Sequence, residues 1–399
     1  EALELFEQLV ADEPRDAMAF LRISQIYRQK RNFEKAHDAA RKAAELDPNS
    51  IEVRYNEVSL LEAEGKANEA IDALKGILSA TAKKNYHPGE RSNRAILLER
   101  LGFLQRAAEQ YGPAVETFRQ MQQLDEEAAP RATIHVIETH RLARELPKAF
   151  EEARAAKDKY PKDRAVQATY AFLAADSGKA DEAERVGRDL IKDKKDRESF
   201  VTLAQIYERT KNYPAMGKAL EEAEKLSADA NEKEGIYFMR GAMYEKQKKF
   251  DLAEAEFRKV LAVSPNSSSA LNYLGYMLAD RNVRLSEAHE MIRKALDQDP
   301  NNGAYLDSLG WVLFRMGKLE EAEEYLKKAL ERTAKDPTVH DHLGDVYIKR
   351  GKVKEAVTQW QRSLKEWETT PSSEQDQSEM AKIQKKLDGA KVRLAKENK

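Results

Sequence analysis

One stretch of the sequence recurs three times with small changes. The copies are LGYMLADRNVRLSEA, LGWVLFRMGKLEEA and LGDVYIKRGKVKEA, and their leucine–glycine pairs begin at Leu274, Leu309 and Leu343. A fixed period of this length is typical of chains built from short structural units, each of which buries its apolar face against the next unit. We therefore expect an array of repeats rather than one central core.

The period extends along nearly the whole sequence. Four of the steps between successive unit starts are 34 residues, and the longest insertion is a turn-rich loop at residues 85–94. A half unit at residues 1–16 precedes the first complete one. The expected units are residues 17–50, 51–84, 95–129, 130–163, 164–196, 197–230, 234–267, 268–302, 303–336 and 337–370.

Small residues at two places in the unit predict a pair of antiparallel helices. The eighth residue is small in eight of the ten units, and the twentieth is alanine in nine of them, from Ala36 to Ala356. Small side chains let two helices approach closely, and proline after the second helix ends it. The unit at residues 164–196 has the weakest pattern, because Gly187 replaces a bulky residue. We expect less buried interface and a bend there.

Composition supports a helical chain and excludes several functions. Charged residues make up 35% of the sequence, with only 17 glycines and 12 prolines among 399 residues. The formal net charge of −2 gives no general electrostatic reason to bind nucleic acid, and the absence of cysteine excludes disulfides and thiolate metal sites. No apolar run is long enough to span a bilayer, so we expect no direct membrane insertion.

No pattern of catalytic residues stands out. The sequence has no phosphate-binding glycine loop, no GxSxG and no HExxH motif. The segment HDHLGD at residues 340–345 is the most suggestive, but Asp341 and Asp345 share a helix face from which His342 points away. We predict a protein that is not an enzyme, with no cofactor and no metal.

The repeated motif resembles that of the tetratricopeptide repeat family, in which LG, Tyr, Ala, Phe, Ala and Pro stand at these offsets. The resemblance implies an all-α fold, a right-handed solenoid whose first helices line a concave groove. It also implies that residues 371–399 form a capping helix, with its lysines on the exposed face. The clamp of Lys and Asn with which some family members hold a carboxylate at a chain terminus is not found.

The groove positions implied by the resemblance differ between the two ends of the chain. The first units supply basic residues, and the last three supply acidic and aromatic ones, although packing alone could explain Tyr276 and Trp311. We expect a protein or peptide ligand to contact Arg100, Arg106, Arg131, Asn272, Tyr273, Tyr276, Asp307, Trp311, Arg315, Asp341, His342 and Asp345.

The leading hypothesis is a scaffold or adaptor that binds a partner in this groove. The last units resemble bacterial envelope tetratricopeptide lipoproteins, which include adaptors that present substrates to a processing protease. This implies the periplasm or envelope, with the cytoplasm as the alternative. A self-assembling protein using Leu3, Leu5, Phe6 and Leu9, or a regulatory domain of a larger protein, are the other hypotheses. The sequence begins within a helical pattern, which suggests a fragment or a mature form.

Overall fold

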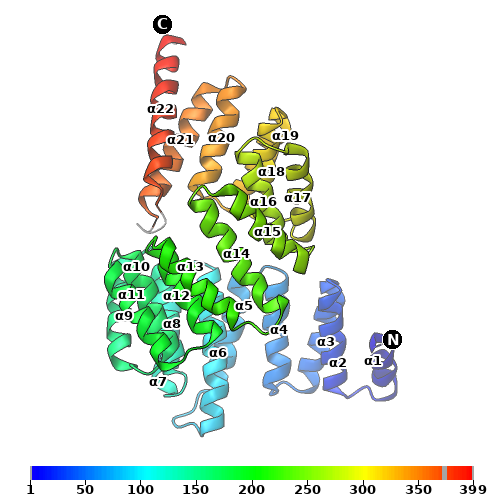
Figure 1. Ribbon diagram of the computed structural model, residues 1–399. Coiled ribbons are helices and arrows are strands. Elements are labelled where there is room, and N and C mark those ends of the chain that lie inside the picture. Colours follow the sequence, from blue (N-terminus) through cyan, green and yellow to red (C-terminus); the bar gives the residue numbers. More distant parts are fainter. Residues whose placement is uncertain (1, 371–374, 398–399) are drawn as a thin grey trace. The chain divides into compact units, whose positions relative to one another are not determined.

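The computed structural model describes residues 2–370 and 375–397, and within them every regular element is an α-helix (Figure 1). The predicted all-α fold is confirmed. The chain divides into two compact units, Glu1–Tyr170 (unit 1) and Ala171–Lys399 (unit 2). The division falls inside helix α10 (Arg164–Asp176), in the segment with the weakest repeat pattern.

The helices alternate between a first and a second member of each pair. The first helices are α2 (Ala17–Gln29), α4 (Ile51–Ala63), α6 (Pro88–Ala107), α8 (Ala129–Leu142), α10, α12 (Arg197–Arg209), α14 (Ala230–Lys246), α16 (Ser268–Asp280), α18 (Gly303–Arg315) and α20 (Pro337–Lys349). The second helices are α3 (Phe33–Leu46), α5 (Ala67–Ala80), α7 (Tyr111–Leu124), α9 (Leu146–Lys159), α11 (Ala180–Asp193), α13 (Tyr213–Lys225), α15 (Phe250–Val263), α17 (Leu285–Gln298), α19 (Leu319–Arg332) and α21 (Val353–Glu368). Helices α1 (Ala2–Asp12) and α22 (Gln377–Glu397) stand at the two ends.

Short polar residues fix where several first helices begin. The side chains of Asp16, Asn302 and Asp336 each accept hydrogen bonds from two backbone N–H groups of the following turn. These bonds satisfy donors that a helix start otherwise leaves unpaired. The chain then reverses into the second helix through a left-handed residue, for which glycine is suited at Gly65 (φ 79°) and Gly317 (φ 80°).

The small residues that define the repeat lie at the contact between paired helices. All nine alanines at the twentieth position are fully buried: Ala36, Ala70, Ala114, Ala149, Ala183, Ala253, Ala288, Ala322 and Ala356. At the eighth position a methyl group on Gly344 would lie 2.5 Å from Trp360 Nε1, and one on Gly310 would lie 2.6 Å from Leu326 Cγ. The helices therefore pack at a separation that larger residues would prevent.

Although Gly187 has no side chain, it does not leave a gap in the packing between helices. A methyl group there would lie 2.8 Å from both Leu203 Cδ1 and Ile206 Cδ1 of α12. Leu203 and Ile206 are buried against this backbone. The expectation of reduced packing at Gly187 is thus wrong, because the glycine lets the next first helix approach.

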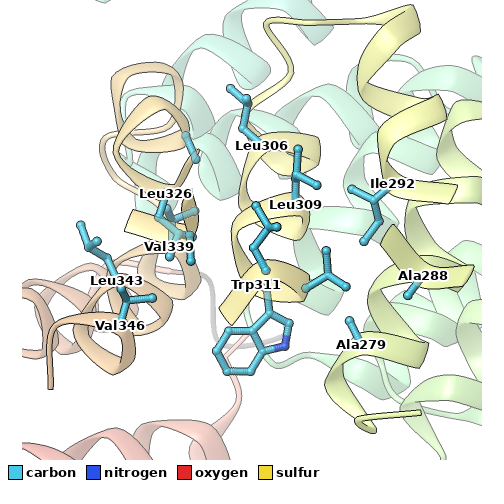
Figure 2. Close-up of a cluster of buried hydrophobic side chains, with 14 of the residues drawn as sticks. Ala279, Ala288, Ile292, Leu306, Leu309, Trp311, Leu326, Val339, Leu343 and Val346 are labelled. Carbon is cyan, nitrogen blue, oxygen red and sulfur yellow. The ribbon is translucent and has the colours of Figure 1, made fainter. Parts of the chain in front are cut away.

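The core of unit 2 continues from one helix pair to the next. Figure 2 shows aliphatic side chains of α18 and α20 facing one another, with the Trp311 indole below them in this view. The same core reaches α22 through Ile383, Leu387 and Ala390, all of which are buried. This packing holds α18, α20 and α22 in a fixed arrangement.

Candidate functional site

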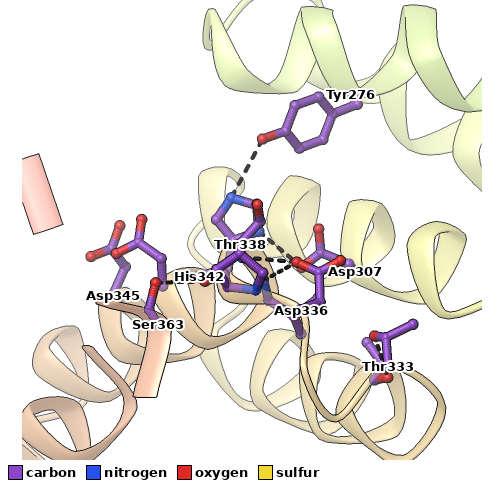
Figure 3. Close-up of polar contacts among 12 residues, drawn as sticks. Tyr276, Asp307, Thr333, Asp336, Thr338, His342, Asp345 and Ser363 are labelled. Carbon is purple, nitrogen blue, oxygen red and sulfur yellow. Dashed lines mark hydrogen bonds and ion pairs between the residues drawn. The ribbon is translucent and has the colours of Figure 1, made fainter. Parts of the chain in front are cut away.

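Three first helices of unit 2 bring two aromatic side chains and a histidine together. Tyr276 comes from α16, Trp311 from α18 and His342 from α20. The Trp311 and His342 rings stack with their centroids 4.1 Å apart, and the Tyr276 hydroxyl lies 3.4 Å from His342 Nε2 (Figure 3). Residues that the sequence placed on three separate units therefore form one cluster.

Asp307 joins this cluster from α18 and fixes the orientation of the histidine. Its Oδ1 atom lies 2.9 Å from His342 Nδ1, and both residues are buried. Because a carboxylate only accepts hydrogen bonds, Nδ1 is the donor. Burial alone would lower the pKa of His342, but the carboxylate of Asp307, assisted by Asp341 and Asp345, raises it above the usual value.

The two other acidic residues of this face are held by a lysine of α22. Lys386 Nζ lies 2.9 Å from both carboxylate oxygens of Asp341 and 2.8 Å from Asp345 Oδ2. Burial and the neighbouring Asp341 raise the pKa of Asp345, although Lys386 opposes this shift. The expectation that the lysines of the last helix face solvent is wrong for Lys386, because two carboxylates at one turn's spacing attract it into the packed surface.

The accessible part of the surface formed by α16, α18 and α20 lies around Tyr273. Its side chain is 43% exposed, while its ring rests edge-on against Phe238, with centroids 5.0 Å apart. The preceding Asn272 is buried, and its Oδ1 atom has no hydrogen-bond partner among the described residues. An exposed ring and an unsatisfied acceptor thus lie next to each other in the sequence of α16.

Trp311 is far less accessible than Tyr273. Only 6% of its surface is exposed, because His342 and Phe314 stack against it and the Arg315 guanidinium lies 5.6 Å from the ring centroid. We call the nine predicted residues of α16, α18 and α20 the unit 2 face. They are Asn272, Tyr273, Tyr276, Asp307, Trp311, Arg315, Asp341, His342 and Asp345. Within it, Trp311, Asp307 and His342 form a packed floor, and Tyr273 and Arg315 remain at the surface.

In unit 1, the predicted basic residues lie on α6 and α8. Arg100 pairs with Glu62, and Arg131 Nε lies 2.9 Å from Glu99 Oε1, which also contacts His135 Nε2 at 2.8 Å. Arg106 instead lies over the Phe103 ring, 5.6 Å from its centroid. We call Arg100, Phe103, Arg106, Arg131 and His135 the unit 1 face.

Comparisons with known proteins agree with this architecture. Two family models, both described as tetratricopeptide repeat, match the sequence, one at residues 284–335 and the other at residues 1–51 and 238–303. The crystal structure of the yeast Tom70 is similar with a TM-score of 0.58 and 18% identity, covering 98% of this chain and 92% of that one. The chain thus contains tetratricopeptide repeats, matched at residues 1–51 and 238–335. None of the curated proteins compared with it matches in sequence.

Two further solved structures resemble this tetratricopeptide repeat protein more distantly. The APC/C hetero-tetramer Cut9–Hcn1 has a TM-score of 0.44 and 13% identity, covering 97% of this chain and 92% of the other. PilW, a type IV pilus biogenesis factor, has a TM-score of 0.40 and 22% identity, covering 50% of this chain and 91% of its own.

Some of the residues that build the two faces of the tetratricopeptide repeat protein were missed by sequence reasoning. Phe238 and Lys386 were not predicted, although the phenylalanine occupies an expected groove position of its unit. Within residues 2–370 and 375–397 there is no group of three His, Asp or Glu residues that could hold a metal ion. Nor does any helix described there have the length and apolarity to cross a membrane.

Proposed function

We propose that this tetratricopeptide repeat protein is a non-enzymatic scaffold that binds peptide segments of a partner protein on the faces of its first helices. The observation that carries the proposal is Tyr273, an exposed ring held edge-on by Phe238 and tilted against Phe257 at 5.8 Å. An aromatic side chain that is already fixed in place gains contact area on binding while losing little conformational freedom.

Asn272 supports the same surface from below. Its Oδ1 atom is buried and has no hydrogen-bond partner among the described residues, so Asn272 backs this surface without being a proposed contact itself. The floor of Trp311, His342 and Asp307 does not need to touch the ligand, because its role is to hold α18 and α20 in register. Tyr273, Tyr276 and Arg315 are the proposed contacts.

The test is affinity capture with the full chain and two single variants. Tyr273→Ser removes the exposed ring of the unit 2 face, and Leu252→Ser is the matched control, since Leu252 is 49% exposed on the second helix α15. Proteins retained by the wild type are identified by mass spectrometry, and binding is then measured with each purified candidate. We expect Tyr273→Ser to weaken binding at least about tenfold and Leu252→Ser to leave it unchanged. Equal binding by both variants would reject the unit 2 face.

A finer role follows from the resemblance of the last units to envelope adaptors. In this role the chain presents substrates to a periplasmic protease, and the assay uses an envelope extract as its source of partners. Recovery of only cytoplasmic proteins would reject the envelope assignment without affecting the scaffold itself.

Self-assembly is a second candidate because α1 carries an exposed apolar residue. Leu5 is 66% exposed, whereas Leu3, Phe6 and Leu9 are half-buried. An exposed apolar patch often marks an association surface. Light scattering over a range of concentrations tests this candidate. A measured mass that remains equal to the monomer mass at every concentration would exclude assembly through α1.

A further inference from the structure

Arg106 is a half-buried cation without an anionic partner among the described residues. It lies in the last turn of α6 with its guanidinium over the Phe103 ring, which is 37% exposed. Among the described residues, no carboxylate lies within ion-pair distance of Arg106 and none of its side-chain donors has a hydrogen-bond acceptor. Burial, with Arg141 nearby, lowers the pKa of Arg106 below its usual value, against the opposing influence of Glu138.

Glu99 of α6 and Glu138 of α8 are carboxylates that are committed to other cations. Glu99 accepts from both Arg131 and His135, and Glu138 lies 2.8 Å from Arg141. A guanidinium carries five donors in a planar fork, and leaving them unpaired in a partly desolvated place is unfavourable. Residues 2–370 and 375–397 therefore provide no anionic partner for Arg106.

Another arginine shows what a completed version of this arrangement looks like. Arg209 lies in the last turn of α12, with its guanidinium 5.0 Å from the centroid of the Phe172 ring. Its Nη1 atom lies 2.8 Å from each oxygen of Asp176, a buried carboxylate. Both sites place an arginine of a last helical turn over a phenylalanine ring, although Phe172 belongs to the preceding first helix α10 and Phe103 to α6 itself. Only the Arg209 site contains a carboxylate paired with the arginine.

We infer that Arg106 and Phe103 form a subsite for a carboxylate of a bound peptide, with an apolar or aromatic residue of that peptide lying on the exposed Phe103 ring. The guanidinium supplies paired hydrogen bonds to a planar oxyanion, and the ring beneath it excludes water from one side. This inference rests on the proposed function, since it names the class of segment that the scaffold accepts: an acidic one, bound by unit 1.

The alternative role for Arg106 is purely structural. A positive charge in the last turn favours the C-terminal end of α6 through the helix dipole. That role requires no ligand, so it predicts that added carboxylates leave the guanidinium environment unchanged. Direct observation of the Arg106 side chain separates the two roles.

The experiment follows the arginine Nε–Hε signals of the full chain by NMR, with the Arg106 signal assigned by its loss in Arg106→Lys. The probes are three dipeptides: N-acetyl-Phe-Glu amide, N-acetyl-Phe-Gln amide and N-acetyl-Phe-Gln with a free C-terminal carboxylate. We expect the Arg106 signal to shift and saturate with at least one carboxylate-bearing dipeptide and not with the uncharged one. The signal of Arg209, whose partner is already present, is the internal control. A response to N-acetyl-Phe-Glu amide would identify a side-chain carboxylate as the ligand. A response to N-acetyl-Phe-Gln with a free C-terminus would identify a terminal carboxylate.

Phe103→Ala tests the ring and should weaken the saturating dipeptide about threefold, the loss expected for a cation–π and ring contact at the surface. An Arg106 signal that responds no more than Arg209, or equally to all three dipeptides, would overturn the inference. Repeating the titration in Tyr273→Ser keeps the two proposals distinct, since loss of the unit 2 face should leave the Arg106 response intact.

Discussion

The unit 1 face and the unit 2 face differ in where the partners of their charges come from. On the unit 2 face, Asp341 and Asp345 are 14% and 17% exposed, and the chain's own Lys386 compensates both. On the unit 1 face, Arg106 is half-buried and has no such partner in the part of the chain that the structure describes. Buried charges must be compensated within the fold, whereas a charge at an accessible edge can await a ligand. We therefore assign the acidic residues of unit 2 to stability and Arg106 to recognition.

The largest effect should follow from removing the lysine that compensates the unit 2 face. In Lys386→Met the two carboxylates lose their cation, and we expect unit 2 to be destabilised by about 3 kcal/mol. All three tryptophans, Trp311, Trp360 and Trp367, lie in unit 2, so tryptophan fluorescence during urea unfolding reports on this unit alone.

The matched control for this change is Lys382→Met on the same helix. Among the described residues, Lys382 forms an ion pair with Glu379 of its own helix alone, and its side chain is 59% exposed, so its loss should change stability by less than about 0.5 kcal/mol. If the two variants unfold at the same urea concentration, the acidic residues of the unit 2 face do not depend on Lys386.

Close packing between paired helices should give the next largest effect. Gly344→Ala places a methyl group against Trp360 Nε1, and we expect a loss of about 2 kcal/mol, seen as an earlier fluorescence transition. Gly389→Ala is the control, because nothing lies within 4 Å of a methyl group there and alanine favours the helix. A Gly344→Ala chain as stable as wild type would show that Trp360 can move aside.

Comparing Arg106 with Arg209 tests most directly the contrast between a charge without an internal partner and a charge with one. Arg209→Gln removes a cation that pairs with the buried Asp176 and should destabilise unit 2 by about 2 kcal/mol. Arg106→Gln removes no internal partner and should change stability by less than about 0.5 kcal/mol. Far-UV circular dichroism during urea unfolding measures both. A loss for Arg106→Gln equal to that of Arg209→Gln would mean that Arg106 is part of the fold.

Sequence reasoning predicted the helix pairs better than the contacts of the faces. Alanine and glycine at the contact recur with the repeat, so residues such as Ala288 and Gly310 predict local packing wherever they stand. The pairing of Lys386 with Asp341 cannot be derived in this way, because it joins residues far apart in sequence and depends on how α22 docks. The same holds for the burial of Trp311, which occupies the same repeat position as Tyr276 but is covered by a histidine from the next unit.

The smallest effect, and the one with opposite signs in the two units, concerns the histidines of the two faces. The pKa of His342 is raised, mainly by Asp307 acting against burial, so its contribution to stability is fully present below the unfolded pKa of about 6.5 and is lost as pH rises through the folded value. Burial lowers the pKa of His135 although Glu99 opposes this, so the contribution of His135 to stability is present above the unfolded pKa of about 6.5 and is lost as pH falls through the lower folded value.

Hydrogen exchange of α20 and α8 peptides, read by mass spectrometry between pH 5 and 8 after correction for the intrinsic exchange rate, should therefore show opposite trends. Each trend should disappear in the matching variant, His342→Gln for α20 and His135→Gln for α8. Parallel trends in both helices, unchanged by these substitutions, would mean that other groups set the pH dependence. Opposite trends would show that the same residue type serves the buried charge network of unit 2 in its protonated form and the packing of unit 1 in its neutral form.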